Sequence, residues 1–154
     1  MLRPDDWILC SWERDGCPMY VRMANAYRDM GNLPGYLYRV IVTVHLREPR
    51  PSGFPSDAED DDLEAFEFNV CGLLEAENKS LCVLVVTGQG LRDIIFYTKE
   101  PEAVRKKVED ARIVLTSHKF EIDIELEPDW RVYNFFCEKL STPIPPETKT
   151  SASA

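Results

Sequence analysis

Residues 81–97 constrain the fold most, because they have the pattern of two apolar strands joined by a tight turn. The segment reads LCVLVVTGQGLRDIIFY, with charge only at Arg92 and Asp93. Val, Ile, Leu, Phe and Tyr dominate both arms, which suits strands of a buried sheet. Gly88-Gln89-Gly90 supplies the positive φ angles that so short a reversal requires. We therefore predict a buried β-hairpin here and a core that forms on it.

Three other segments also have the pattern of strands. Residues 7–23 predict an N-terminal hairpin around Asp15-Gly16, a dipeptide that favours tight turns. Residues 36–46 predict one long strand, and residues 24–35 before it predict a loop. Apolar and acidic side chains alternate strictly in the last strand, with Phe120, Ile122, Ile124 and Leu126 on one face and Glu121, Asp123 and Glu125 on the other. A charged outer face of this kind is typical of an edge strand.

Three helices are expected between and after these strands. Ser56 with Glu59 three residues later has the spacing of a capping box, and the apolar stripe of this first helix is Leu63, Phe66, Val70, Leu73 and Leu74. Pro101 suits the first turn of a second helix, whose buried stripe is Val104, Val108, Ala111 and Leu115. Asp129 is the expected N-cap of a short third helix, with the apolar face Trp130, Tyr133, Phe136 and Cys137.

The order of these elements from residue 36 to residue 126 is strand, helix, strand, strand, helix, strand. It predicts an α+β fold with a ferredoxin-like split βαβ core, a mainly antiparallel sheet and helices on one face. Strand 36–46 then lies between strands 91–97 and 120–126.

Strand 81–86 is left as an apolar edge in this arrangement, and bare edges of that kind aggregate. We expect the N-terminal hairpin to cover it; a meander joining that hairpin to strand 36–46 is the alternative. One domain is expected over residues 1–140, followed by a disordered Ser/Thr/Pro-rich tail at 141–154.

The composition argues against several classes of protein. Of the 154 residues, 44% are hydrophobic, and 27 acidic against 18 basic residues give a net charge of −9. Nucleic acids and anionic membranes require a basic surface, so we expect neither as a partner. No apolar run approaches the roughly 20 residues that cross a bilayer, and no signal sequence is expected. The five cysteines form no CxxC pair, so we expect reduced, buried thiols in a cytoplasmic protein, with the oligomeric state open.

The motifs give no indication of a metal, a cofactor or a nucleophile. The acidic run 57–62 lacks the alternating ligands and central glycine of a calcium loop, which favours a solvated helix start. His45 and His118 are the only histidines, and neither has the spacing of a zinc ligand. His45 could act as a general base, but no motif identifies a nucleophile for it. Gly88-Gln89-Gly90 joins two strands, so it predicts a turn and not a phosphate loop.

A candidate binding surface is drawn from polar and aromatic residues that stand out in the predicted elements: Arg22, Arg92, Asp93, Tyr97, Trp130 and Tyr133. Trp130 and Tyr133 are amphipathic aromatics of the kind enriched at interfaces, although the same pattern fits side chains that close one end of a core. Arg92 and Asp93 interrupt an apolar strand, either as a partly buried polar pair or at the solvent end of the hairpin.

Several short motifs follow one another along the chain: Trp7, Arg14-Asp15-Gly16-x-Pro18 with Arg22, Gly53-x-Pro55 before Glu59, Gly90-x-Arg92-Asp93-x-x-x-Tyr97, and Pro128-Asp129-Trp130-x-x-Tyr133. Together they resemble the bacterial "domain of unknown function 695" family over residues 7–136. That family has no established activity, so the resemblance implies an α+β fold and little chemistry.

The closing Trp130-x-x-Tyr133 is also similar to a motif of the RNase E regulator B family, which implies a regulatory, protein-binding role. Glu127 stands where the resemblance leads us to expect Asp before Pro128, so the role of that acid is open.

Three functions follow as hypotheses. The leading one is a non-catalytic protein-binding or regulatory module. The second is an enzyme whose site is assembled from dispersed residues, namely Arg22, Arg92, Asp93 and Glu59. The third is an acidic immunity-like or nucleic-acid-mimic inhibitor that presents Glu121, Asp123 and Glu125 to a basic partner.

Overall fold

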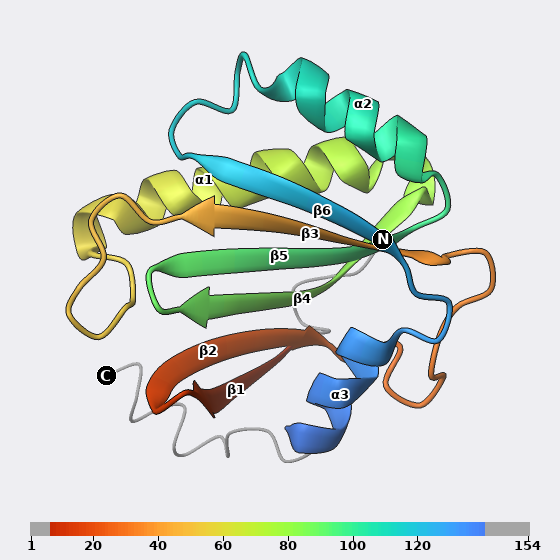
Figure 1. The fold of residues 1–154 in the computed structure, drawn as a ribbon, viewed down its shortest axis with the longest axis horizontal. Coiled ribbons are helices and arrows are strands. Elements are labelled where there is room, and N and C mark those ends of the chain that lie inside the picture. Colours follow the sequence, from red (N-terminus) through yellow and green to blue (C-terminus); the bar gives the residue numbers. More distant parts are fainter. Residues whose placement is uncertain (1–6, 141–154) are drawn as a thin grey trace.

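A six-stranded antiparallel sheet forms the centre of the molecule (Figure 1). The computed structural model describes residues 7–140, so the predicted tail at 141–154 lies outside the described residues. The elements in chain order are β1 (Trp7–Arg14), β2 (Cys17–Ala24), β3 (Tyr38–His45), α1 (Asp57–Leu74), the short 3-10 helix η2 (Ala76–Asn78), β4 (Ser80–Gly88), β5 (Leu91–Thr98), α2 (Pro101–Ala111), β6 (Phe120–Leu126) and α3 (Arg131–Lys139). The strand order is β1-β2-β4-β5-β3-β6. The predicted α+β class is confirmed.

The central hairpin is β4 and β5, and every residue of β4 is buried. Gly88 pairs with Leu91, so the chain reverses through Gln89 and Gly90, whose φ angles are 53° and 79°. Gly53 lies against this turn, because its carbonyl accepts a hydrogen bond from the Gly90 N–H at 3.0 Å. A Cβ atom at Gly53 would lie only 2.7 Å from the backbone nitrogen of Gln89. The loop before α1 is thereby fastened to the hairpin.

The N-terminal hairpin, β1 and β2, extends the sheet beyond β4. It reverses at Asp15 and Gly16, both with positive φ, and Val21 of β2 lies opposite Val86 of β4. The hairpin therefore covers the apolar edge of β4 and does not pair with β3, which lies between β5 and β6. Strands β1 and β6 form the two edges of the sheet.

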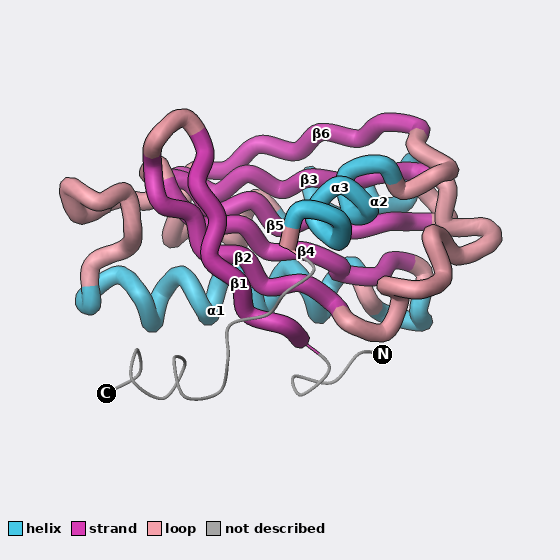
Figure 2. The backbone as a smooth tube through the Cα atoms, turned by 90° about the horizontal axis from the view of Figure 1, so that it is seen from below, coloured by secondary structure: helices cyan, strands magenta, loops and turns pink. Residues whose placement is uncertain are grey.

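Two hydrophobic cores lie on opposite faces of the sheet. On one face, α1 and α2 pack against alternate residues of β3, β4 and β5. On the other face, α3 and the segment between β2 and β3 pack against β2, β4 and β5. Strand β5 serves both cores, since Ile94 and Phe96 face the first and Ile95 and Tyr97 face the second. Figure 2 shows α1 and α3 on opposite sides of the strands.

Three local predictions differ from the structure. Helix α2 ends at Ala111, and Leu115 is buried from the loop that follows it. Leu126 is 61% exposed, although its alternation with Ile122 and Ile124 predicted a core position; it ends an edge strand, so no element covers it. Asp129 is not the N-cap of α3; that position is Trp130, with φ at 52°.

The cysteines are all free thiols, of which Cys10 and Cys82 are buried and Cys17, Cys71 and Cys137 are half-buried. Cys10 and Cys17 pair with other residues across the N-terminal hairpin. Within residues 7–140, no helix combines the length and the apolar character that crossing a membrane would need.

Candidate functional site

The six residues of the candidate surface separate into three places in the structure. Arg92 and Asp93 are neighbours in β5, so their side chains point to opposite faces of the sheet. Arg92 joins Arg22 on the α1 face, where both contact the carboxylate of Glu67. Asp93 lies on the face of α3, where it accepts a hydrogen bond from Thr43 Oγ1 at 2.7 Å. Tyr97, Trp130 and Tyr133 are in the core.

Tyr97, Trp130 and Tyr133 are each 0% exposed, so the prediction that they belong to a contact surface is wrong. The Tyr97 and Trp130 rings stack at 4.3 Å with an interplanar angle of 5°. Trp130 Nε1 donates to the Tyr36 carbonyl at 2.8 Å, and the Tyr133 hydroxyl donates to the Ala24 carbonyl. The polar atoms of Trp130 and Tyr133 therefore satisfy one carbonyl at the end of β2 and one in the segment before β3. Of the two alternatives left open for Trp130 and Tyr133, the structure shows the core role.

Glu127, whose role the sequence left open, is the centre of this buried cluster. Its carboxylate lies 2.6 Å from Arg39 Nη1, accepts the Tyr97 hydroxyl at 2.5 Å and accepts the Val132 N–H at 3.0 Å. The last contact supplies the cap that Trp130 cannot give to α3. Burial and the Glu127 carboxylate raise the pKa of the Tyr97 hydroxyl, so Tyr97 remains a donor. The role of Glu127 is therefore structural: its carboxylate joins Arg39, Tyr97 and the start of α3.

Arg22 and Arg92 share one carboxylate on the α1 face. Arg22 Nη2 donates to both oxygens of Glu67 at 2.6 Å, and Arg92 Nη1 donates to Oε1 at 3.0 Å. Arg92 also donates from Nε to Thr87 Oγ1 at 2.9 Å. Burial lowers the pKa of the Arg92 guanidinium, and the Glu67 carboxylate opposes this shift, so Arg92 stays charged. The two arginines are fixed in position before any ligand arrives.

A groove of about 760 Å³ opens above this cluster, between α1 and the N-terminal hairpin. Its lining residues come from β1, β2, β4, β5, α1 and the C-cap of α1: Trp7, Leu9, Tyr20, Arg22, Asp60, Glu64, Glu67, Phe68, Cys71, Glu75, Cys82, Thr87 and Arg92. Phe68 is 78% exposed and Tyr20 is 39% exposed, so large apolar side chains stand free beside the charged cluster. The Arg22 guanidinium lies 5.9 Å from the centre of the Trp7 ring. We call this cavity the α1 groove.

Glu59, predicted as part of a capping box, performs half of that role. Its N–H donates to Ser56 Oγ at 3.3 Å, but its carboxylate turns to the loop after β3 and accepts the N–H groups of Arg47 and Glu48 at 2.6 and 2.9 Å. His118 Nε2 lies 2.7 Å from the same carboxylate. Burial by itself would raise the pKa of Glu59, but these donors outweigh it and the pKa is lowered.

His118 lies between this carboxylate and a serine, since its Nδ1 is 2.9 Å from Ser117 Oγ. The imidazole is buried, and its ring packs edge-on against Phe66. Ser117, His118 and Glu59 therefore fasten the loop before β6 to the start of α1.

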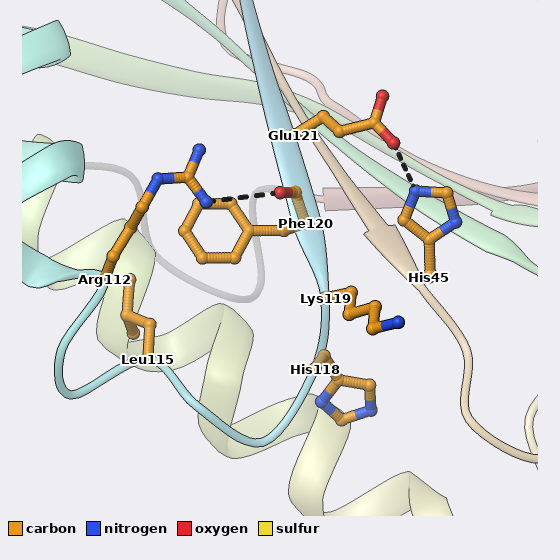
Figure 3. Close-up of a pocket in the computed structure, with 7 residues that line it drawn as sticks. All are labelled: His45, Arg112, Leu115, His118, Lys119, Phe120 and Glu121. Atoms are coloured by element: carbon orange, nitrogen blue, oxygen red, sulfur yellow. Dashed lines mark hydrogen bonds and ion pairs between the residues drawn. The ribbon is translucent and has the colours of Figure 1, made fainter.

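His45 lines a second, shallower pocket of about 590 Å³ at the start of β6 (Figure 3). Its Nε2 lies 2.6 Å from Glu121 Oε1. Figure 3 shows His45 and Glu121 on one side of β6 and Arg112 on the other. The Arg112 guanidinium packs over the Phe120 ring at 4.4 Å. Strand β6 thus separates the His45–Glu121 pair from Arg112, so these polar groups do not converge on one point of the pocket.

The acidic face of β6 is partly neutralised. Arg39 Nη2 lies 3.0 Å from Glu125 and 3.5 Å from Asp123, and His45 contacts Glu121. Among residues 7–140 there is no group of three or more His, Cys, Asp or Glu side chains placed to hold a metal ion.

Comparison with known proteins gives a family and no activity. A family model described as "Family of unknown function (DUF695)" matches residues 5–137. The chain belongs to the DUF695 family. No curated protein and no solved structure matches it. The DUF695 match includes every residue of the α1 groove and the buried cluster around Glu127, so both belong to the family domain.

Proposed function

We propose that this DUF695 protein is a non-catalytic protein-binding or regulatory module, and that the α1 groove is its contact surface. The observation that carries the proposal is Phe68, a large apolar side chain that is 78% exposed on the rim of a groove lined by two half-buried arginines. Aromatic and arginine side chains are enriched among the residues that dominate binding energy at interfaces. The occupant is a segment of another protein.

The geometry of the groove favours binding in two ways. Burying the Phe68 side chain on association contributes about 1.5–3 kcal/mol. Glu67 already fixes Arg22 and Arg92, so a ligand that contacts them loses little side-chain entropy in doing so.

The two alternative functions have less support. Of the dispersed enzyme site, Arg22 and Arg92 converge on Glu67, whereas Asp93 faces the opposite side of the sheet and Glu59 contacts the loop after β3. For the acidic inhibitor, the carboxylates of Asp123 and Glu125 on β6 already contact the Arg39 guanidinium, which reduces the negative charge they offer to a basic partner.

Three finer expectations belong to the same proposal. A ferredoxin-like split core is supported by the antiparallel order β4-β5-β3-β6 with α1 and α2 packed in one core. A distant relation to the RNase E regulator B family rests on Trp130 and Tyr133, which are buried, so it concerns the fold of α3 more than a contact surface. A cytoplasmic setting agrees with five free cysteines, whereas a bacterial one rests only on the family resemblance.

The experiment compares two apolar surface residues. Phe68→Ala removes the side chain on the groove rim, and Ile113→Ala is the matched control, because Ile113 is 82% exposed in the loop after α2. Both variants should melt like the wild type, since neither side chain is buried. Affinity purification followed by mass spectrometry should recover the same specific partners with wild type and Ile113→Ala and lose them with Phe68→Ala. Equal recovery by Phe68→Ala would show that the groove is not the contact surface.

A further inference from the structure

The wall of the α1 groove that α1 provides is acidic, and the groove as a whole is lined by four carboxylates, those of Asp60, Glu64, Glu67 and Glu75, against two arginines. Asp60 and Glu64 line the groove and are exposed. Within residues 7–140 neither forms a salt bridge, whereas Glu67 in the floor of the groove has both Arg22 and Arg92. The two floor arginines share the single Glu67 carboxylate, and the open carboxylates of Asp60 and Glu64 are those that a ligand meets first.

Asp60, Glu64 and Phe68 form a row along α1, because they are four residues apart. Successive members of the row are separated by about 6 Å along the helix axis. In an extended chain, side chains on one face recur every second residue, which is roughly 6.8 Å. An extended segment lying along α1 can therefore place alternate side chains opposite each member of the row.

We propose, on the basis that the α1 groove is the contact surface, that its partner is a segment with Arg or Lys at two alternate positions and an apolar residue at the next alternate position. In either chain direction the two cations lie opposite Asp60 and Glu64, and the apolar side chain lies against Phe68 and Tyr20. A second copy of the chain is a poor occupant, because two molecules of net charge −9 repel one another.

The test uses a displayed library of random dodecapeptides as the probe. Selection on the wild-type protein should enrich the basic-x-basic-x-apolar pattern or its reverse. The variant Asp60→Lys/Glu64→Lys should lose these peptides, with affinity for a synthetic copy falling roughly tenfold or more. The matched control is Glu102→Lys/Asp129→Lys, which changes the net charge equally at exposed acids outside the groove; it should retain them.

The outcomes separate this inference from the proposed function. Selected peptides that are lost with Phe68→Ala but are not basic, or that still bind Asp60→Lys/Glu64→Lys, would leave the groove as the contact surface and overturn the basic partner. Selected peptides that bind Phe68→Ala unchanged would overturn the groove itself. Equal loss in both charge variants would assign the binding to net charge, and failure to enrich any sequence would count against both proposals.

Discussion

Replacing Glu127 by Gln should show that the buried cluster beneath α3 depends on its charge. Arg39 is 8% exposed and Glu127 is 2% exposed, and their nearest atoms are 2.6 Å apart. Removing one partner of a buried ion pair costs about 3–5 kcal/mol. Glu125 and Asp123, which are mostly exposed, still contact Arg39, so we expect the lower end, about 3 kcal/mol. A chain of this length should then melt roughly 6–12 °C lower.

The measurement is urea unfolding at neutral pH, with thermal melting as a second readout. Glu125→Gln is the control, since it removes a carboxylate from the same arginine at an exposed position and should cost less than about 1 kcal/mol. The double variant Arg39→Met/Glu127→Gln should lose less stability than the two single variants added together, because the unpaired charge disappears. This account would be refuted if Glu127→Gln lowered the free energy of unfolding by less than about 1 kcal/mol. It would also be refuted if the effects of the Arg39 and Glu127 substitutions were strictly additive in the double variant.

Three further predictions concern stability. Trp130→Ala should cost about 3–5 kcal/mol by calorimetry, because the indole is fully buried; a neutral result would contradict its core position. Glu59→Gln should destabilise the protein at neutral pH, and because the folded pKa of Glu59 is lowered, its contribution is present above about pH 4.3 and is lost as the pH falls. Denaturant titrations should therefore show that the difference in free energy of unfolding between wild type and Glu59→Gln shrinks in acid. A difference that stays constant with pH would contradict this role of the Glu59 carboxylate. Gly53→Ala should lower the free energy of unfolding in urea by more than about 1 kcal/mol, because its Cβ would clash with the backbone of Gln89. Gly72→Ala is the control and should be neutral or stabilising, because a Cβ there has nothing within 4 Å. Equal effects of the two substitutions would show that the close approach of Gly53 to Gln89 is not the cause.

Local chemistry was enough to predict most of the elements. Gly90 and the Asp15-Gly16 dipeptide determine where the hairpins reverse, since few other residues accept positive φ. The apolar edge at β4 required a covering strand, and β2 supplies it. Asp129 failed as a cap because a more distant acid, Glu127, reaches the helix from within the core. Which of two nearby acids caps a helix depends on tertiary packing and not on spacing.

The candidate site was harder to predict, because its parts are distant in the sequence. Arg92 stood out as a polar residue in an apolar strand and Arg22 as part of a family motif, but Glu67, which joins them, is one acid among many on an acidic helix. Likewise, the spacing of Trp130 and Tyr133 defines an apolar helix face without saying whether a sheet or a partner covers it. The exposure of Phe68, which carries the proposed function, depends on where α1 lies over the sheet.

The place of the α1 groove follows from that arrangement of layers. Helices α1 and α2 cover β3, β4 and β5 on one face, and α3 fills the other face as far as β1. The N-terminal hairpin adds two strands that extend past α1, so among the described residues Leu9, Tyr20 and Arg22 face the flank of α1 and no further helix. The element that protects the apolar edge of β4 therefore also creates the open groove. A partner of the kind we propose would complete the layer that α1 leaves unfinished, so we expect its contact residues to lie on the helix flank and the hairpin and not on the buried aromatics of α3.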